Sequence, residues 1–143
     1  MSSKGLEIID HSAQLTHEWV NELVERLDWS NHKDALRLLR VTLRQVRDHI
    51  SHDEMAQFSA QLPLLIRGMF YEGWVPKNTP SKDRKLSSFV AAIEETISDV
   101  LEYRGTQDIQ TVFRLINARI SRGETNDVRA NLPEEIRELW PEP

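Results

Sequence analysis

The sequence predicts an all-α fold of about eight helices, arranged as two pseudo-symmetric four-helix repeats that pack into one bundle-like domain. Apolar residues recur every three or four positions through most of the chain, which is the spacing of one helix face. Segment 51–67 also returns seventy residues later as segment 121–137. Both copies carry a serine three residues before a glutamate, then Leu-Pro, then Ile-Arg. Chance periodicity explains matched apolar stripes but not two such motifs in phase, so we expect a duplication within a single domain over residues 1–143.

The first repeat is expected over about residues 12–70. After a loose arm, a first helix should start near Ser12 or Thr16 and run to about Leu27, because apolar residues then recur on one face. Ser30 or Asn31 can cap a second helix that ends near residue 50. Two short helices follow, separated by the first Leu-Pro pair.

The short helices are predicted from their caps. Ser51 and Glu54 form a capping box, in which the serine hydroxyl accepts from the glutamate N–H and the glutamate side chain reaches back to the serine N–H. Pro63 should end this helix and open the next one, because the residue before a proline avoids helical angles. Ser121 and Glu124 repeat the capping box in the second copy.

A Gly- and Pro-rich connector is expected over residues 71–85, and the second repeat over about 86–140. Its first helix should bury Val100 and Leu101 and stop at Gly105. The last helix should end near Trp140.

The stretch from residue 66 to residue 76, Ile-Arg-Gly-Met-Phe-Tyr-Glu-Gly-Trp-Val-Pro, resembles the bacterial family called domain of unknown function 2267. The two Leu-Pro motifs and the closing Leu139-Trp140 add to the resemblance, which covers about residues 19–140. The resemblance implies an all-helical fold with an internal duplication. It implies no activity, cofactor or catalytic residue.

Composition narrows the class of protein. The 143 residues carry a net charge of −5, shared evenly between the halves, so nucleic-acid binding is not favoured. The absence of cysteine favours a reducing compartment. No apolar run reaches the roughly 20 residues that span a bilayer, and the first residues lack the apolar core of a signal peptide. We therefore expect a cytoplasmic protein with no membrane partner.

Four arginines are spaced three and four residues apart on the second helix and form one basic stripe: Arg37, Arg40, Arg44 and Arg47. One interpretation is a docking surface for an acidic partner, a phosphate-bearing ligand or nucleic-acid backbone. The other is a solvated helix flank whose arginines cover the edge of the core and pair with local carboxylates.

An apolar pair supplies a second candidate surface. Leu64 and Leu65 correspond to Glu134 and Glu135 in the other repeat, so the leucines either lie in the centre of the fold or form a patch for another chain. Two aromatic residues of the connector can join this interface or clamp the connector to the core. They are Tyr71 and Trp74.

No catalytic motif is present. His49 and His52, with the acids beside them, suggest a metal or acid–base cluster, but a helix cap lies between the two histidines. We therefore expect no enzyme activity and no cofactor. The first functional hypothesis is an interaction module that binds a protein partner or itself, and the alternative is a domain that binds an anionic small molecule or nucleic acid through the arginine stripe.

Overall fold

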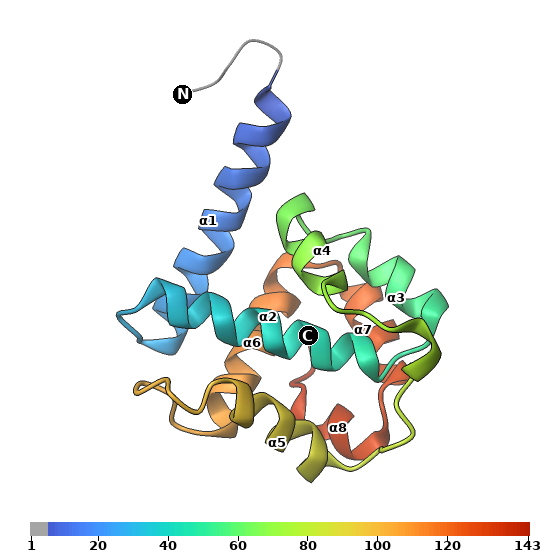
Figure 1. The fold of residues 1–143 in the computed structure, drawn as a ribbon. Helices are drawn as coiled ribbons and strands as arrows, with labels where there is room; N and C mark the ends of the chain where they lie inside the picture. The colour runs from blue at the N-terminus through green and yellow to red at the C-terminus, as the bar shows by residue number, and fades with distance from the viewer. Residues whose placement is uncertain (1–5) are drawn as a thin grey trace.

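The computed structural model describes residues 6–143, which form eight α-helices and no strand (Figure 1). The first four are α1 (Glu7–Leu27), α2 (His32–Asp48), α3 (His52–Ser59) and α4 (Leu64–Tyr71). After a short 3-10 turn, η1 (Pro76–Asn78), follow α5 (Leu86–Thr96), α6 (Thr106–Arg119), α7 (Arg122–Asn131) and α8 (Glu134–Leu139). The predicted all-α fold is confirmed. None of these helices combines the length and the apolar character needed to cross a membrane.

All eight helices contribute to one continuous apolar core. Helix α1 packs against α6, α2 packs against both α4 and α5, and α3 packs against α7. The second repeat contributes Trp140, whose ring stacks on Phe113 with centroids 4.4 Å apart. Since elements of one repeat pack directly on elements of the other, neither repeat has a separate core.

Three helices begin at the polar caps that the sequence predicts. The side chain of Asn31 accepts a hydrogen bond from the N–H of Asp34 at 3.0 Å. The hydroxyls of Ser51 and Ser121 accept from the residue three positions later, at 3.1 and 3.2 Å. These bonds satisfy N–H groups that the first turn of a helix leaves without a partner.

Two helix boundaries differ from the prediction. Helix α1 begins at Glu7, so residues 7–12 of the expected loose arm are helical, and residues 1–5 lie outside the described residues. Helix α5 ends at Thr96, nine residues before Gly105. The chain then turns, which buries Val100 but leaves Leu101 97% exposed instead of buried.

Two arginines after the Leu-Pro pairs make the same three contacts in both repeats. Arg67 donates from Nε to the carbonyl of Ser59 at 2.9 Å, and from Nη2 to those of Ala60 and Leu62. Arg137 makes the three bonds that are shifted by seventy residues, at 2.7, 3.1 and 3.0 Å. Each guanidinium thus satisfies carbonyls at the end of the preceding helix, where a positive charge is also favoured by the helix dipole.

The contact between α3 and α7 joins the two repeats. The N–H of Ser51 donates to the amide oxygen of Asn131 at 2.7 Å, and the N–H of Ser121 donates to the amide oxygen of Gln61 at 2.9 Å. The predicted capping boxes are therefore only half correct. An amide from the opposite repeat occupies the serine N–H that each glutamate was expected to reach.

Candidate functional site

The basic stripe of α2 is largely neutralised within the chain. Arg37 binds both carboxylate oxygens of Asp99, at 3.2 and 2.8 Å, and the carbonyl of Thr96. This guanidinium holds the pKa of Asp99 below its usual range. The pair joins α2 to the turn after α5.

Two further arginines of the stripe converge on one carboxylate. Arg40 contacts Glu72 at 2.5 Å, and Arg44 binds the same oxygen of Glu72. The hydrogen bond from Arg40 is the main reason that the pKa of Glu72 lies below its usual range. Because the carboxylate of Glu72 is exposed, its ion pairs with Arg40 and Arg44 contribute little to the free energy of unfolding.

Arg47 differs from the other three arginines because it is buried, with 4% of its surface exposed. Its Nη1 donates to the carbonyls of Phe70 and Glu72, at 2.9 and 2.8 Å, and its Nε pairs with Asp48. The prediction that Arg47 belongs to an exposed binding stripe is therefore wrong. This residue holds the end of α4 and the start of the connector against α2.

The three remaining arginines line a hollow of about 160 Å³ on α2, next to the end of α5. Val41 and Thr96 complete its wall. The side chains of Arg37, Arg40 and Arg44 are each about a third exposed. An anion that entered the hollow would have to share these groups with Asp99 and Glu72.

Apolar side chains are exposed at the start of α4. Leu64 is 55% exposed and Leu65 is 46% exposed, so these two side chains do not lie in the centre of the fold. Leu65, Gly68 and Met69 line a groove of about 310 Å³, with Arg40 and Glu72 at its polar edge. The groove is open at Gly68, because a side chain added there would meet no other atom within 4 Å.

The two aromatic residues of the connector, Tyr71 and Trp74, make contacts within the chain. The hydroxyl of Tyr71 lies 2.8 Å from that of Ser59, and Trp74 donates from its indole N–H to Thr79 at 3.0 Å. The rings of Tyr71 and Trp74 also contact one another. The structure thus places both residues in the clamp between connector and core, which was the alternative to an interface role.

A second apolar surface lies at the beginning of α1, where the sequence predicts a loose arm. Figure 1 shows the first turns of α1 extending away from the other helices. Leu6, Ile8 and Ile9 are 43%, 68% and 58% exposed. Ile8 stands one turn before the buried Ser12, on the face that continues into the core. Because Ser12 is polar, the apolar pattern of the sequence stops there, and the helix was not predicted to extend back to Glu7.

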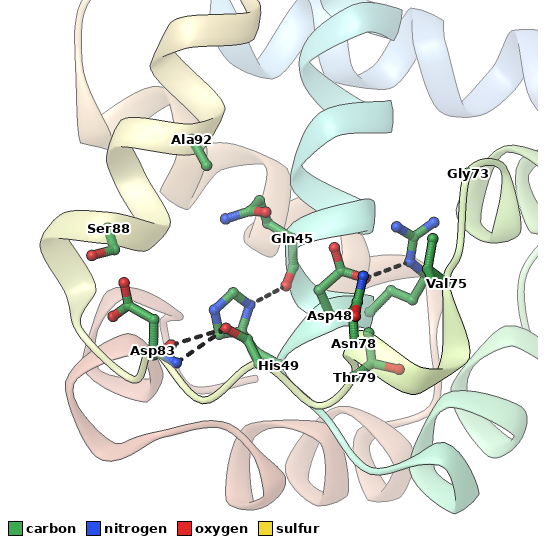
Figure 2. Close-up of a pocket in the computed structure, with 12 residues that line it drawn as sticks. Gln45, Asp48, His49, Gly73, Val75, Asn78, Thr79, Asp83, Ser88 and Ala92 are labelled. Carbon is green, nitrogen blue, oxygen red and sulfur yellow. Dashed lines mark hydrogen bonds and ion pairs between the residues drawn. The ribbon is translucent and has the colours of Figure 1, made fainter.

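A polar pocket of about 320 Å³ lies between the end of α2, the connector and α5. Figure 2 shows the ring of His49 between Gln45 on α2 and Asp83 on the connector. Its Nδ1 lies 2.7 Å from the carbonyl of Gln45, which can only accept, so this nitrogen carries a hydrogen. The hydroxyl of Ser88 lies beside Asp83, and its hydrogen bond is the main reason that the pKa of this carboxyl lies below its usual range.

The pocket residues mainly hold the connector in place. Asp48 accepts from the N–H of Ser81 through its carbonyl at 2.6 Å and pairs with Arg47 through its carboxylate. His52 does not line this pocket, and its Nε2 lies 3.1 Å from the carbonyl of Thr79 and 3.0 Å from its hydroxyl. Within residues 6–143, no group of three or more metal-binding side chains is placed to hold an ion.

Of the predicted site residues, the structure therefore brings only a few together on an accessible surface. Leu64 and Leu65 are exposed beside the groove, whose edge includes Arg40 from the stripe.

A comparison with protein families finds a match over residues 16–139 to the family described as uncharacterized conserved protein (DUF2267). No curated protein matches the chain. Because the family match covers most of the chain, as the resemblance of the connector and the Leu-Pro motifs predicts, this protein belongs to the DUF2267 family.

Proposed function

We propose that this protein is a non-enzymatic helical interaction module of the bacterial cytoplasm, and that its partner is a second copy of itself. The observation that carries the proposal is the exposure of Leu64 and Leu65 beside an apolar groove. Adjacent exposed leucines are costly in water, and apolar patches with polar edges are typical of interaction surfaces. The absence of cysteine supports the cytoplasmic location.

The start of α1 supplies a complementary surface on the same chain. It is a helix that presents Ile8 and Ile9, and an apolar groove is the ordinary receptor for such a helix. To reach Arg40 at the edge of the groove, the acids Glu7 and Asp10 of its first turn would share this guanidinium with Glu72. Because this end of α1 extends away from its own body, it is accessible to a neighbouring molecule (Figure 1).

This arrangement predicts an exchange in which the α1 end of each molecule occupies the α4 groove of the other. Such a contact is closed by a two-fold axis, so it produces a dimer instead of a growing chain. The dimer places Leu64 and Leu65 of one molecule against Ile8 and Ile9 of the other.

Sedimentation equilibrium over a wide range of protein concentrations tests the proposal. We expect the wild-type mass to rise from monomer to dimer, and the double variant Leu64→Glu/Leu65→Glu to stay monomeric. The double variant Ile8→Glu/Ile9→Glu should have the same effect, because it removes the other side of the same contact. Leu101→Glu is the matched control, since Leu101 is 97% exposed and lies in neither surface.

A monomeric wild type at every concentration would overturn self-association. A dimer that survives both double variants would show that another surface makes the contact. A dimer that is lost in one double variant and retained in the other would show that the α1 end does not bind in the α4 groove.

A second candidate function is the binding of an anionic small molecule, and it is favoured by the hollow between Arg37, Arg40 and Arg44. Titration with inorganic phosphate, followed by amide chemical shifts, tests it. We expect saturable shifts around the hollow that weaken steeply with added salt and disappear in Arg40→Gln. Arg84→Gln, a change at an exposed connector arginine, should leave them unchanged. Shifts that are absent or that do not saturate would contradict this function.

A further inference from the structure

Two glutamates meet where the repeats join, and neither belongs to the surfaces described above. Glu54 is the third residue of α3 and Glu124 is the third residue of α7. They are seventy residues apart and follow the two capping serines. Helices α3 and α7 pack against one another, and the side chains of Glu54 and Glu124 interact across this contact.

The cap geometry turns both carboxyl groups inward. In a complete capping box, each carboxylate would accept from the serine N–H. Here those N–H groups are already bound by Asn131 and Gln61. Gln61 also donates from Nε2 to the hydroxyl of Ser121 at 3.0 Å, which completes the contact from this side. The glutamate side chains are therefore free to leave the helix ends.

Both side chains are buried and incompletely bound. Glu54 is 9% exposed and Glu124 is 7% exposed. One oxygen of each carboxyl, Oε2, is buried and has no donor among the described residues. Two ionised carboxylates in this position would repel one another and lack compensating donors, whereas a proton held between them supplies the missing hydrogen bond.

No neighbouring basic side chain in the described part of the chain neutralises the two carboxyl groups in place of that proton. Burial and then the hydrogen bond with Glu54 raise the pKa of Glu124 to about 8, and the charge of Asp127 adds to this. The basic side chains of α3 and α7 have other partners: His52 contacts Thr79, Arg122 donates to the carbonyl of Pro143, and Arg129 donates to the carbonyl of Trp140. At the end of α6, Arg119 pairs with acids of α1.

We propose that Glu54 and Glu124 share a proton at neutral pH, and that this proton is a pH-sensitive latch between the two repeats. Loss of the proton leaves two buried negative charges at the α3–α7 contact, which weakens the packing of one repeat on the other. The latch depends only on the contact inside one chain, so it stands independently of the proposed self-association.

The direction of the pH effect follows from which state binds the proton more tightly. The pKa of Glu124 is raised from an ordinary value of 4.5 to about 8 on folding. Between these values the folded protein holds a proton that the unfolded chain has lost, so stability falls as pH rises through this window. The folding equilibrium constant should fall by at most about tenfold per pH unit, and the effect should level off above about pH 8.

Urea unfolding between pH 5.5 and pH 9 tests the latch. We expect the wild type to lose stability across this range, and Glu124→Gln and Glu54→Gln each to flatten the profile, because a neutral amide donates to the remaining carboxylate at every pH. Glu95→Gln, at an exposed position of α5, should retain the wild-type profile. Comparison with this control removes the contribution of the histidines.

A measurement on the wild type covers the case in which a variant does not fold. Infrared or carbon-13 NMR spectra of the native protein should show a protonated glutamate at pH 7, which ionises at alkaline pH. Spectra in which every glutamate is ionised at pH 7 would overturn the proposal. So would wild-type and Gln-variant stability profiles of the same slope.

Discussion

Helices α4 and α8 occupy equivalent places in the two repeats, but their first turns have different surroundings. Both follow a Leu-Pro pair, and both bury an isoleucine, Ile66 or Ile136, completely. In α8 the first turn carries acids, and Glu135 accepts a hydrogen bond from the N–H of Leu86 at the start of α5. In α4 the equivalent positions are exposed leucines.

The two repeats thus share their internal contacts, which we call the framework, but differ at the surface. The framework contacts are the same in both copies, since Arg67 and Arg137 bind equivalent carbonyls. Acids at the start of α8 suit the positive end of the helix dipole and need no partner chain. Leu64 and Leu65 at the start of α4 remain about half exposed in the isolated molecule, which is why we propose the interaction surface on the first repeat.

The largest expected effect tests whether the two frameworks contribute equally. Phe70 and Trp140 are equivalent positions and are almost fully buried. We expect Phe70→Ala and Trp140→Ala each to lower the free energy of unfolding by about 4 kcal/mol, because each leaves a large cavity. Urea denaturation measures both values. A loss in one repeat that is several times the loss in the other would show that the core is not shared evenly.

An intermediate effect is expected from the paired arginines. Arg67→Ala and Arg137→Ala each remove three hydrogen bonds to helix-terminal carbonyls, so we expect each to cost about 2 kcal/mol of unfolding free energy. Arg84→Ala is the control, as an exposed arginine of the connector. Unequal costs in the same urea measurement would contradict the equivalence that the hydrogen bonds indicate.

The smallest stability effect should come from exchanging the first turn itself. Leu64→Glu/Leu65→Glu gives α4 the acids of α8, and in the monomer we expect it to change the free energy of unfolding by only about 0.5 kcal/mol, in the stabilising direction. Thermal unfolding at low protein concentration measures this change. A strong destabilisation would mean that the leucines support the fold of the single molecule and are not an interaction surface.

Local features of this fold were predictable from consecutive residues. The caps at Asn31, Ser51 and Ser121 were predicted because each lies three residues before the N–H that it binds. The turn after α5 was not, because Val100 and Leu101 continue an apolar pattern that only the packing of the chain interrupts. The start of α1 at Glu7 was not predicted either, because the polar Ser12 is buried there and breaks the apolar pattern that identifies a helix face.

The sequence by itself determined the all-α class and the caps at Asn31, Ser51 and Ser121, because these depend on short-range spacing, and it also contains the motifs that recur after seventy residues. Only the tertiary structure decided that Arg47 is buried while Arg40 stays accessible, although both lie on one stripe. It also decided that Glu54 and Glu124 face each other. The partner of a polar side chain depends on which distant segment packs against it, and helical periodicity specifies the face of a helix but not the neighbour that covers it.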